Sequence, residues 1–144
     1  MYFPSVRIGR KAFKHLLEKR RVWVLIPYQL GNSTVIAYYV PYSTRHRGRG
    51  TKKISILAYV TDYIYPVYPD TLKRILPETG YAFIKELYGA YHIGQYIVLQ
   101  DMHAYKLTPA LKTEQWNGFR WCEECKLMVL PYSEYCPICK WRGS

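Results

Sequence analysis

The four cysteines of the chain stand in two C-x-x-C pairs. Cys122 and Cys125 form the first pair, Cys136 and Cys139 form the second, and ten residues separate the pairs. The short spacing lets both thiolates of a pair face one ion from a tight turn, and two such turns complete a tetrahedron. Four thiolates leave no open position for water, so the pattern predicts a structural zinc ion. Two disulfides or a rubredoxin-like iron centre are the alternatives, but nothing in the sequence marks an oxidising compartment.

The residues around the two pairs, about 119–142, resemble the zinc ribbons of archaeal and eukaryotic transcription and translation proteins. The resemblance implies a small unit that binds nucleic acid, binds protein or caps a fold. Leu127–Tyr135 is predicted to form a hairpin between the pairs, with Pro131 near its bend. Flanking aromatic side chains are expected to shield the metal and dock the unit, and nearby cations to moderate the thiolate charge. The aromatic residues are Phe119, Trp121 and Trp141, and the cations are Lys126, Lys140 and Arg142.

Positive charge is concentrated in the first third of the sequence. The net charge is +11, from 21 Lys+Arg against 10 Asp+Glu. Residues 1–53 hold 12 of the basic residues and a single acid, Glu18, whereas residues 54–144 hold nine of each kind. Charges that serve only solubility would be distributed along the whole chain, whereas a surface that binds phosphate groups would concentrate the basic residues. The asymmetry favours a nucleic-acid partner over a face that is merely solvated.

Residues 10–21 read as a short amphipathic helix. Phe13, Leu16, Leu17 and Ala12 fall on one side at helical spacing. The basic side chains share one quadrant of the other side, with Glu18 among them. These basic residues are Arg10, Lys11, Lys14 and Arg21. Such a ridge can follow a phosphate backbone while the apolar side packs on a core. An ordinary solvated helix face is the alternative.

A second basic segment, residues 41–53, separates the predicted strands Thr34–Val40 and Lys53–Tyr63. Gly48 and Gly50 let its backbone bend freely. Its cations are Arg45, Arg47, Arg49, Lys52 and Lys53. Arginine offers a planar fork to phosphate and stacks on exposed bases, so we expect this loop to become ordered on RNA or DNA. A disordered surface loop is the alternative.

The remaining pattern predicts an α+β chain with a β-rich body. An initial strand and the basic helix come first, and residues 22–28 and 34–40 are expected to pair as a hairpin. A long strand, two short helices and a final strand follow. These last elements are predicted at Lys53–Tyr63, Thr71–Leu76, Tyr81–Tyr88 and Tyr96–Tyr105. The expected division is a domain over 1–109, a connector over 110–118 and a zinc ribbon over 119–144.

This order of elements over about residues 3–109 resembles the PUA-like superfamily, particularly ASCH-type domains. The resemblance is carried by Leu16–Arg20 before the strand Val22–Tyr28, by Gly80-Tyr81, and by Tyr96–Leu99 before Leu107–Pro109. It implies a small, partly closed β-barrel that binds RNA, sometimes through one modified or flipped base. One ASCH branch hydrolyses an amide of modified cytidine with a Lys–Thr–Glu set. Here no Thr follows shortly after Lys19, which favours binding over catalysis.

Other catalytic patterns are weak. The sequence has no phosphate-binding Gly-Lys-Ser loop, no dinucleotide fingerprint and no zinc-deaminase signature. Asp101 and His103 alternate onto one face of the predicted strand and are either an acid/base pair or, as favoured here, its polar side. Sixteen tyrosines are unusual for 144 residues, and some are expected to stack on unpaired bases.

The sequence therefore predicts a cytoplasmic, non-catalytic nucleic-acid-binding protein, with RNA favoured over DNA. The alternatives are a zinc-ribbon protein that binds DNA, an RNA polymerase or another protein, and an ASCH-like amidohydrolase. A content of 49% apolar residues excludes a disordered chain, and no apolar run approaches the length of a membrane span. No secretory signal is expected from the first residues. The scarcity of Asn and Gln suggests a thermophilic, archaeal-like source.

Overall fold

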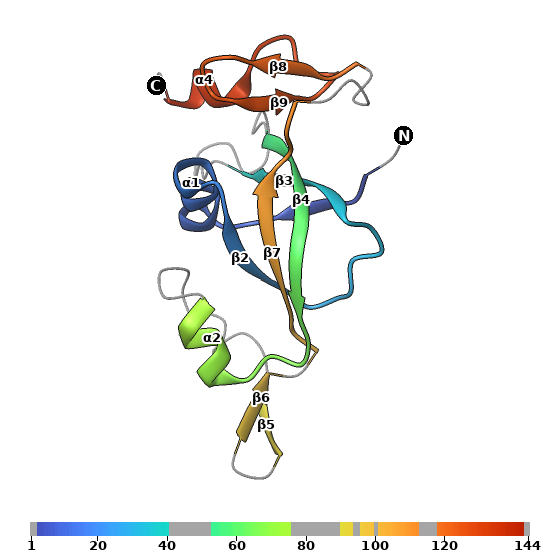
Figure 1. The fold of residues 1–144 in the computed structure, drawn as a ribbon, viewed down its shortest axis with the longest axis vertical. Coiled ribbons are helices and arrows are strands. Elements are labelled where there is room, and N and C mark those ends of the chain that lie inside the picture. Colours follow the sequence, from blue (N-terminus) through green and yellow to red (C-terminus); the bar gives the residue numbers. More distant parts are fainter. Residues whose placement is uncertain are drawn as a thin grey trace, which may run out of the picture.

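The computed structural model describes residues 3–40, 53–75, 90–93, 96–99, 101–112 and 118–142. This part of the chain is mixed α+β, and most of its elements are strands (Figure 1). In chain order the elements are β1 (Ser5–Arg7), α1 (Arg10–Lys19), β2 (Val22–Ile26), β3 (Thr34–Tyr39), β4 (Ile54–Ile64), α2 (Pro69–Ile75), β5 (Ala90–Ile93), β6 (Tyr96–Leu99), β7 (His103–Pro109), β8 (Arg120–Cys122), β9 (Leu127–Val129) and α4 (Pro137–Arg142). None of these helices is long and apolar enough to cross a membrane.

Five strands form one sheet in the order β1-β3-β4-β7-β2, which curls into a half-barrel (Figure 1). β1 runs parallel to β3, and the other neighbours are antiparallel. The predicted hairpin between residues 22–28 and 34–40 is therefore wrong. β2 pairs with β7 instead, in a register that places Val22 and Val24 opposite Leu107 and Tyr105. This pairing continues the buried face of β2 across the sheet, because Leu107 and Tyr105 belong to the same core cluster as Val22 and Val24.

The amphipathic character predicted for residues 10–21 is confirmed. α1 begins after Gly9, whose carbonyl accepts the N–H of Phe13 at 2.9 Å, and it ends at Arg20, which adopts a left-handed φ of 61°. Its buried residues pack against the concave face of the sheet in the main hydrophobic core. They are Ala12, Phe13, Leu16 and Leu17. The apolar stripe thus fixes which side of the helix is left for solvent.

The opposite face of the sheet carries a smaller core. Leu72 of α2 is fully buried there with Val67, Met102 and Ala104. Residues Thr71–Ile75 of the predicted helix Thr71–Leu76 lie within α2. Leu76 and the predicted helix Tyr81–Tyr88 fall outside the described residues. The curled sheet is thus covered on its two faces by different helices.

The predicted strand Tyr96–Tyr105 is divided in the structure. β6 pairs with β5 in a separate hairpin, whereas β7 joins the five-stranded sheet. Asp101 stands between β6 and β7 in a turn, with a left-handed φ of 56°. The expectation that Asp101 and His103 share one strand face is therefore wrong, because the turn redirects the chain just before His103.

The C-terminal unit comprises β8, β9 and α4, at the top of Figure 1. The hairpin predicted over Leu127–Tyr135 is wrong. The observed hairpin joins β8 to β9 and carries the first cysteine pair in its turn. The second pair stands at the start of α4, where Pro137 is the first helical residue, a position that favours proline.

Candidate metal centre and basic surface

The four cysteine sulfurs converge on one point. All four lie within 4.8 Å of one another. The separations are 3.5 Å between Cys122 and Cys139, 3.1 Å between Cys125 and Cys139, and 3.8 Å between Cys125 and Cys136. A tetrahedral ion with metal–sulfur bonds of about 2.3 Å needs sulfurs about 3.8 Å apart, so the arrangement fits one metal ion. The cysteines are not bridged, since a disulfide would bring two sulfurs to about 2.05 Å.

Each C-x-x-C pair is shaped by the same backbone turn. The N–H of Lys126 donates to the carbonyl of Cys122 at 2.7 Å, and the N–H of Lys140 donates to the carbonyl of Cys136 at 3.3 Å. Lys126 reaches this bond with a left-handed φ of 56°. The residue after each pair therefore closes a loop that turns both thiols inward, as the spacing predicts.

The chemistry of the thiols also suits a cation. Burial is the main cause that raises the pKa of the Cys125 thiol to about 11, and the neighbouring thiols of Cys122 and Cys136 raise it further. Hydrogen bonds with Cys125 and Cys122 raise the pKa of Cys139. Burial opposes ionisation of Cys122 too, but hydrogen bonds, led by the Cys125 backbone, lower the pKa of Cys122 below its ordinary value. A bound dication would offset the charge of the assembled thiolates and release their protons.

The first cysteine pair is part of the main core. Cys125, Leu127 and Ile138 are buried in the same cluster as Phe13 and Leu16 of α1. Arg20, at the end of α1, donates from Nη2 to the carbonyl of Cys125 at 2.6 Å and from Nη1 to the carbonyl of Lys126 at 3.2 Å. The guanidinium thus fastens the helix to the metal-binding turn. Sequence reasoning missed this role, because nothing local relates residues 105 positions apart.

Two of the aromatic residues predicted to dock the C-terminal unit do so. Phe119 and Trp121 are half-buried and pack on a cluster that includes Phe3 and Leu57. The rings of Phe3 and Phe119 meet edge to face, with centroids 6.3 Å apart. The side chains of Trp141 and Arg142 lie outside the described part of the structure.

The two lysines predicted near the thiolates are exposed. Lys126 pairs with Glu123 at 3.1 Å, so its charge is already matched by a carboxylate. Lys140 follows Cys139 directly in α4.

The predicted basic residues of the helix form one exposed ridge. Arg10, Lys11 and Lys14 lie on the solvent side of α1, opposite its buried stripe, and Arg21 follows the end of the helix. None of these four side chains forms an ion pair with any carboxylate among the residues that the structure describes. Within the described part of the chain, the ridge therefore presents positive charge that no ion pair neutralises, with Glu18 as the one acid on the same helix.

The strand ends that flank the second basic segment lie close to α1. Arg45, Arg47, Arg49 and Lys52 fall outside the described residues. Lys53 is exposed, and its Nζ lies 4.5 Å from the ring centroid of Tyr38, a cation–π contact. Tyr39 pairs with Ile54, and its ring lies 6.0 Å from the ring of Phe13 in α1. The chain thus leaves and re-enters the sheet beside the basic helix.

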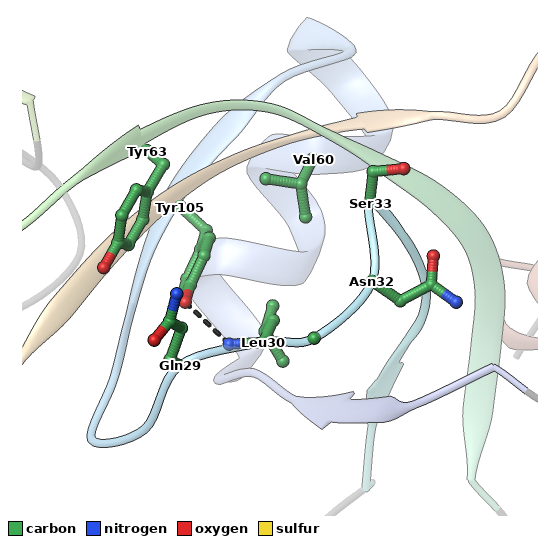
Figure 2. Close-up of a pocket in the computed structure, with 8 residues that line it drawn as sticks. Gln29, Leu30, Asn32, Ser33, Val60, Tyr63 and Tyr105 are labelled. Atoms are coloured by element: carbon green, nitrogen blue, oxygen red, sulfur yellow. Dashed lines mark hydrogen bonds between the residues drawn. The ribbon is translucent and has the colours of Figure 1, made fainter.

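A shallow hollow of about 280 Å³ opens on the concave side of the sheet, beyond α1 (Figure 2). The segment between β2 and β3 forms one wall, and side chains of β4 and β7 form the other. Its lining residues are Gln29, Leu30, Gly31, Asn32, Ser33, Val60, Tyr63 and Tyr105. The Leu30 N–H donates to the Tyr105 hydroxyl at 2.7 Å, which joins the two walls (Figure 2).

The bond from Arg20 gives a first prediction. We expect Arg20→Lys to lower the free energy of unfolding by about 1–2 kcal/mol, because a lysine cannot reproduce two charge-assisted hydrogen bonds from one planar fork. Arg21→Lys, one residue further on and exposed, is the matched control and should leave the value unchanged. Urea unfolding followed by circular dichroism measures both. Equal stabilities of the two variants would contradict a fastening role for Arg20.

No protein-family model, curated protein or solved structure matches this chain.

Proposed function

We propose that this protein binds nucleic acid by neutralising backbone phosphates with its basic surface. The observation that carries the proposal is the exposed ridge of α1, whose cations lack carboxylate partners in the described structure. Like charges at helical spacing repel one another, so the ridge is stabilised by a row of external anions. A nucleic-acid backbone supplies such a row. The basic segment 41–53 adds to the ridge in this proposal, since Tyr39 and Ile54, the strand residues that flank it, pair beside α1.

The proposal includes a PUA-like barrel and RNA as the favoured ligand. The curled five-stranded sheet with a helix on its concave face supports such a barrel. RNA is favoured over DNA because the resemblance to PUA-like domains implies RNA.

We assign Zn²⁺ as the metal and a structural role to it. Four cysteine sulfurs within 4.8 Å of one another supply the donor set that zinc prefers in closed sites. The cysteines would hold the ion, which would cross-link the two turns. Four thiolate ligands would leave no open coordination position for catalysis. The C-terminal unit then stabilises the core on which α1 lies.

A salt titration tests the proposed function. We expect the wild-type chain to bind single-stranded RNA with an affinity that falls as salt rises, with a logarithmic slope of about −0.7 for each phosphate contacted. Reversing Arg45, Arg47 and Arg49 together to glutamate should abolish binding and flatten this dependence. Filter binding with RNA and with single- and double-stranded DNA of one sequence measures the affinity and the preference. No binding to any of the three would refute the proposal, and unchanged affinity of the triple variant would remove the 41–53 segment from it.

A second candidate function is docking of the C-terminal unit on a protein such as a polymerase. The observation in its favour is a pair of tyrosines beside the second cysteine pair, Tyr132 and Tyr135, which are 74% and 68% exposed. Capture of partners from an extract, with and without nuclease, separates the two candidates. Partners that persist after nuclease treatment and are lost in a Tyr132→Ala/Tyr135→Ala variant would support protein docking.

A further inference from the structure

Four aromatic side chains form a row on the face of the sheet that α1 also packs against. We call this row the aromatic ladder. It consists of Tyr63 in β4, Tyr65 just after β4, and His103 and Tyr105 in β7. The register of β4 and β7 shifts between Val60 and Asp62 and then places Tyr63 directly opposite Tyr105. Side chains two residues apart on a strand share a face, so Tyr65 and His103 form the next step of the ladder. The bulge thus determines which residues reach this face.

The four rings are nearly parallel. The centroids of Tyr65 and His103 are 4.1 Å apart with planes inclined by 14°, and those of Tyr63 and Tyr105 are 4.9 Å apart at 25°. Tyr63 and His103 are also nearly parallel, with centroids 5.7 Å apart. These separations are typical of stacked aromatic side chains. The ladder is therefore a stacked platform, in which the inner ring faces cover one another and a further ring can stack only on an outer face.

Hydrogen bonds hold the platform in place. The Tyr105 hydroxyl accepts the Leu30 N–H at 2.7 Å, and the Tyr63 hydroxyl lies 2.7 Å from Nδ1 of His103. Burial lowers the pKa of His103, and Asp101 opposes this shift only in part, so the imidazole is neutral at pH 7. Burial also raises the pKa of Tyr63, so its hydroxyl stays protonated at pH 7. The rings are thus oriented before any ligand arrives.

One edge of this platform is open to solvent. Tyr105 is 3% exposed and belongs to the core, whereas Tyr63 and Tyr65 are 41% and 51% exposed. Ordinary cross-strand packing explains the contact between the rings, but it does not require two oriented tyrosines to remain exposed, one of which, Tyr63, lines the hollow. That hollow, of about 280 Å³, is smaller than the roughly 300–1,000 Å³ of a site for a drug-sized molecule. Its size suits one planar ring.

We infer that the aromatic ladder stacks an unpaired nucleobase over Tyr63 and Tyr65, which makes the protein selective for single-stranded over double-stranded nucleic acid. The inference rests on the proposed function and names the form of ligand that it takes. Stacking needs an exposed base face, which a duplex interior does not offer. The amide of Gln29 lies at the rim of the hollow and can bond the edge of such a base (Figure 2). The phosphates would remain with the cations, so the ladder adds affinity without adding salt dependence.

The test compares ladder variants with a control on the C-terminal unit. The variants are Tyr65→Ala and Tyr63→Leu, the second of which keeps a bulky side chain but loses the planar ring. Tyr132→Ala removes a more exposed tyrosine far from the ladder in sequence. Each ladder variant should lose about 5- to 150-fold in affinity for a single-stranded RNA, the usual effect of removing one base-stacking side chain. The salt slope of each ladder variant and its affinity for double-stranded RNA should not change. Tyr65→Phe, which keeps the ring, should bind as tightly as the wild type.

The outcomes separate the inference from the proposed function. A single-stranded RNA that contains 2-aminopurine reports stacking directly, and its fluorescence should be quenched by the wild-type chain and by Tyr132→Ala but not by Tyr65→Ala. If the wild type binds RNA and both ladder variants bind as tightly as Tyr132→Ala does, the ladder inference is overturned and the proposed function stands. If the wild type binds no nucleic acid, the proposed function fails and the inference fails with it.

Discussion

Removal of the metal is expected to unfold the sheet together with the C-terminal unit. Cys125 is only 4% exposed, and it shares one hydrophobic cluster with Leu127, Ile138 and the apolar side of α1. Structural zinc contributes about 10–16 kcal/mol of apparent binding free energy to small zinc domains, which is as large as the stability of a typical domain. Loss of the ion should therefore unfold the sheet and the C-terminal unit together, rather than unfold the C-terminal unit alone.

The measurement is thermal unfolding followed by circular dichroism, before and after a chelator, and in the Cys125→Ser variant. Hydrogen exchange at the amides of β7 shows whether the sheet opens along with β8 and β9. Tyr132→Ala, an exposed change in the same unit, should melt like the wild type. Elemental analysis of the untreated protein should find one zinc ion per chain. A chelated protein that keeps protected β7 amides while β8 and β9 exchange would show that the sheet does not depend on the metal.

Reversal of two cations on α1 is expected to weaken RNA binding about 10- to 100-fold and to reduce the salt slope by about 1.4, or 0.7 for each phosphate that is no longer neutralised. The variant is Lys11→Glu/Lys14→Glu. Both side chains are exposed, and glutamate is about as favourable in a helix as lysine. A negative charge in the first turns also suits the helix dipole. The fold should therefore survive, so that the weaker binding reports the ridge alone.

Lys73→Glu/Arg74→Glu on α2 is the matched control, because it changes the net charge by the same amount on the other face of the sheet. We expect it to reduce affinity far less and to keep the wild-type salt slope. The two double variants are compared by filter binding at several salt concentrations. Equal reductions in both would mean that total charge attracts the nucleic acid and that the ridge of α1 is no specific contact surface.

Local patterns in the sequence were sufficient for α1 and for the cysteine cluster. The spacing of Phe13, Leu16 and Leu17 determines the buried side of the helix, and hence its exposed basic side. The C-x-x-C spacing determines the turns in which the thiols converge. Both signals depend on residues a few positions apart, where backbone geometry alone relates the side chains.

The partners of the strands were not predictable in the same way. Alternation shows which side chains of β2 are buried, but it does not show that β7, rather than the nearby β3, lies alongside. The sequence favours a hairpin after the first cysteine pair because a turn around Pro131 is visible in it, whereas the observed turn lies within the pair and also serves as the metal-binding loop. The aromatic ladder depends on a register shift after Val60, which no local pattern signals.

The shared core has a consequence for synthesis on the ribosome. The apolar side of α1 is made early, but Ile138, which completes the cluster around it, is made much later. In a nascent chain, part of the apolar side of α1 therefore remains exposed until Cys136 and Cys139 have been synthesised and bind the metal ion. Metal supply during translation would then decide how many newly made chains reach the folded form and how many aggregate.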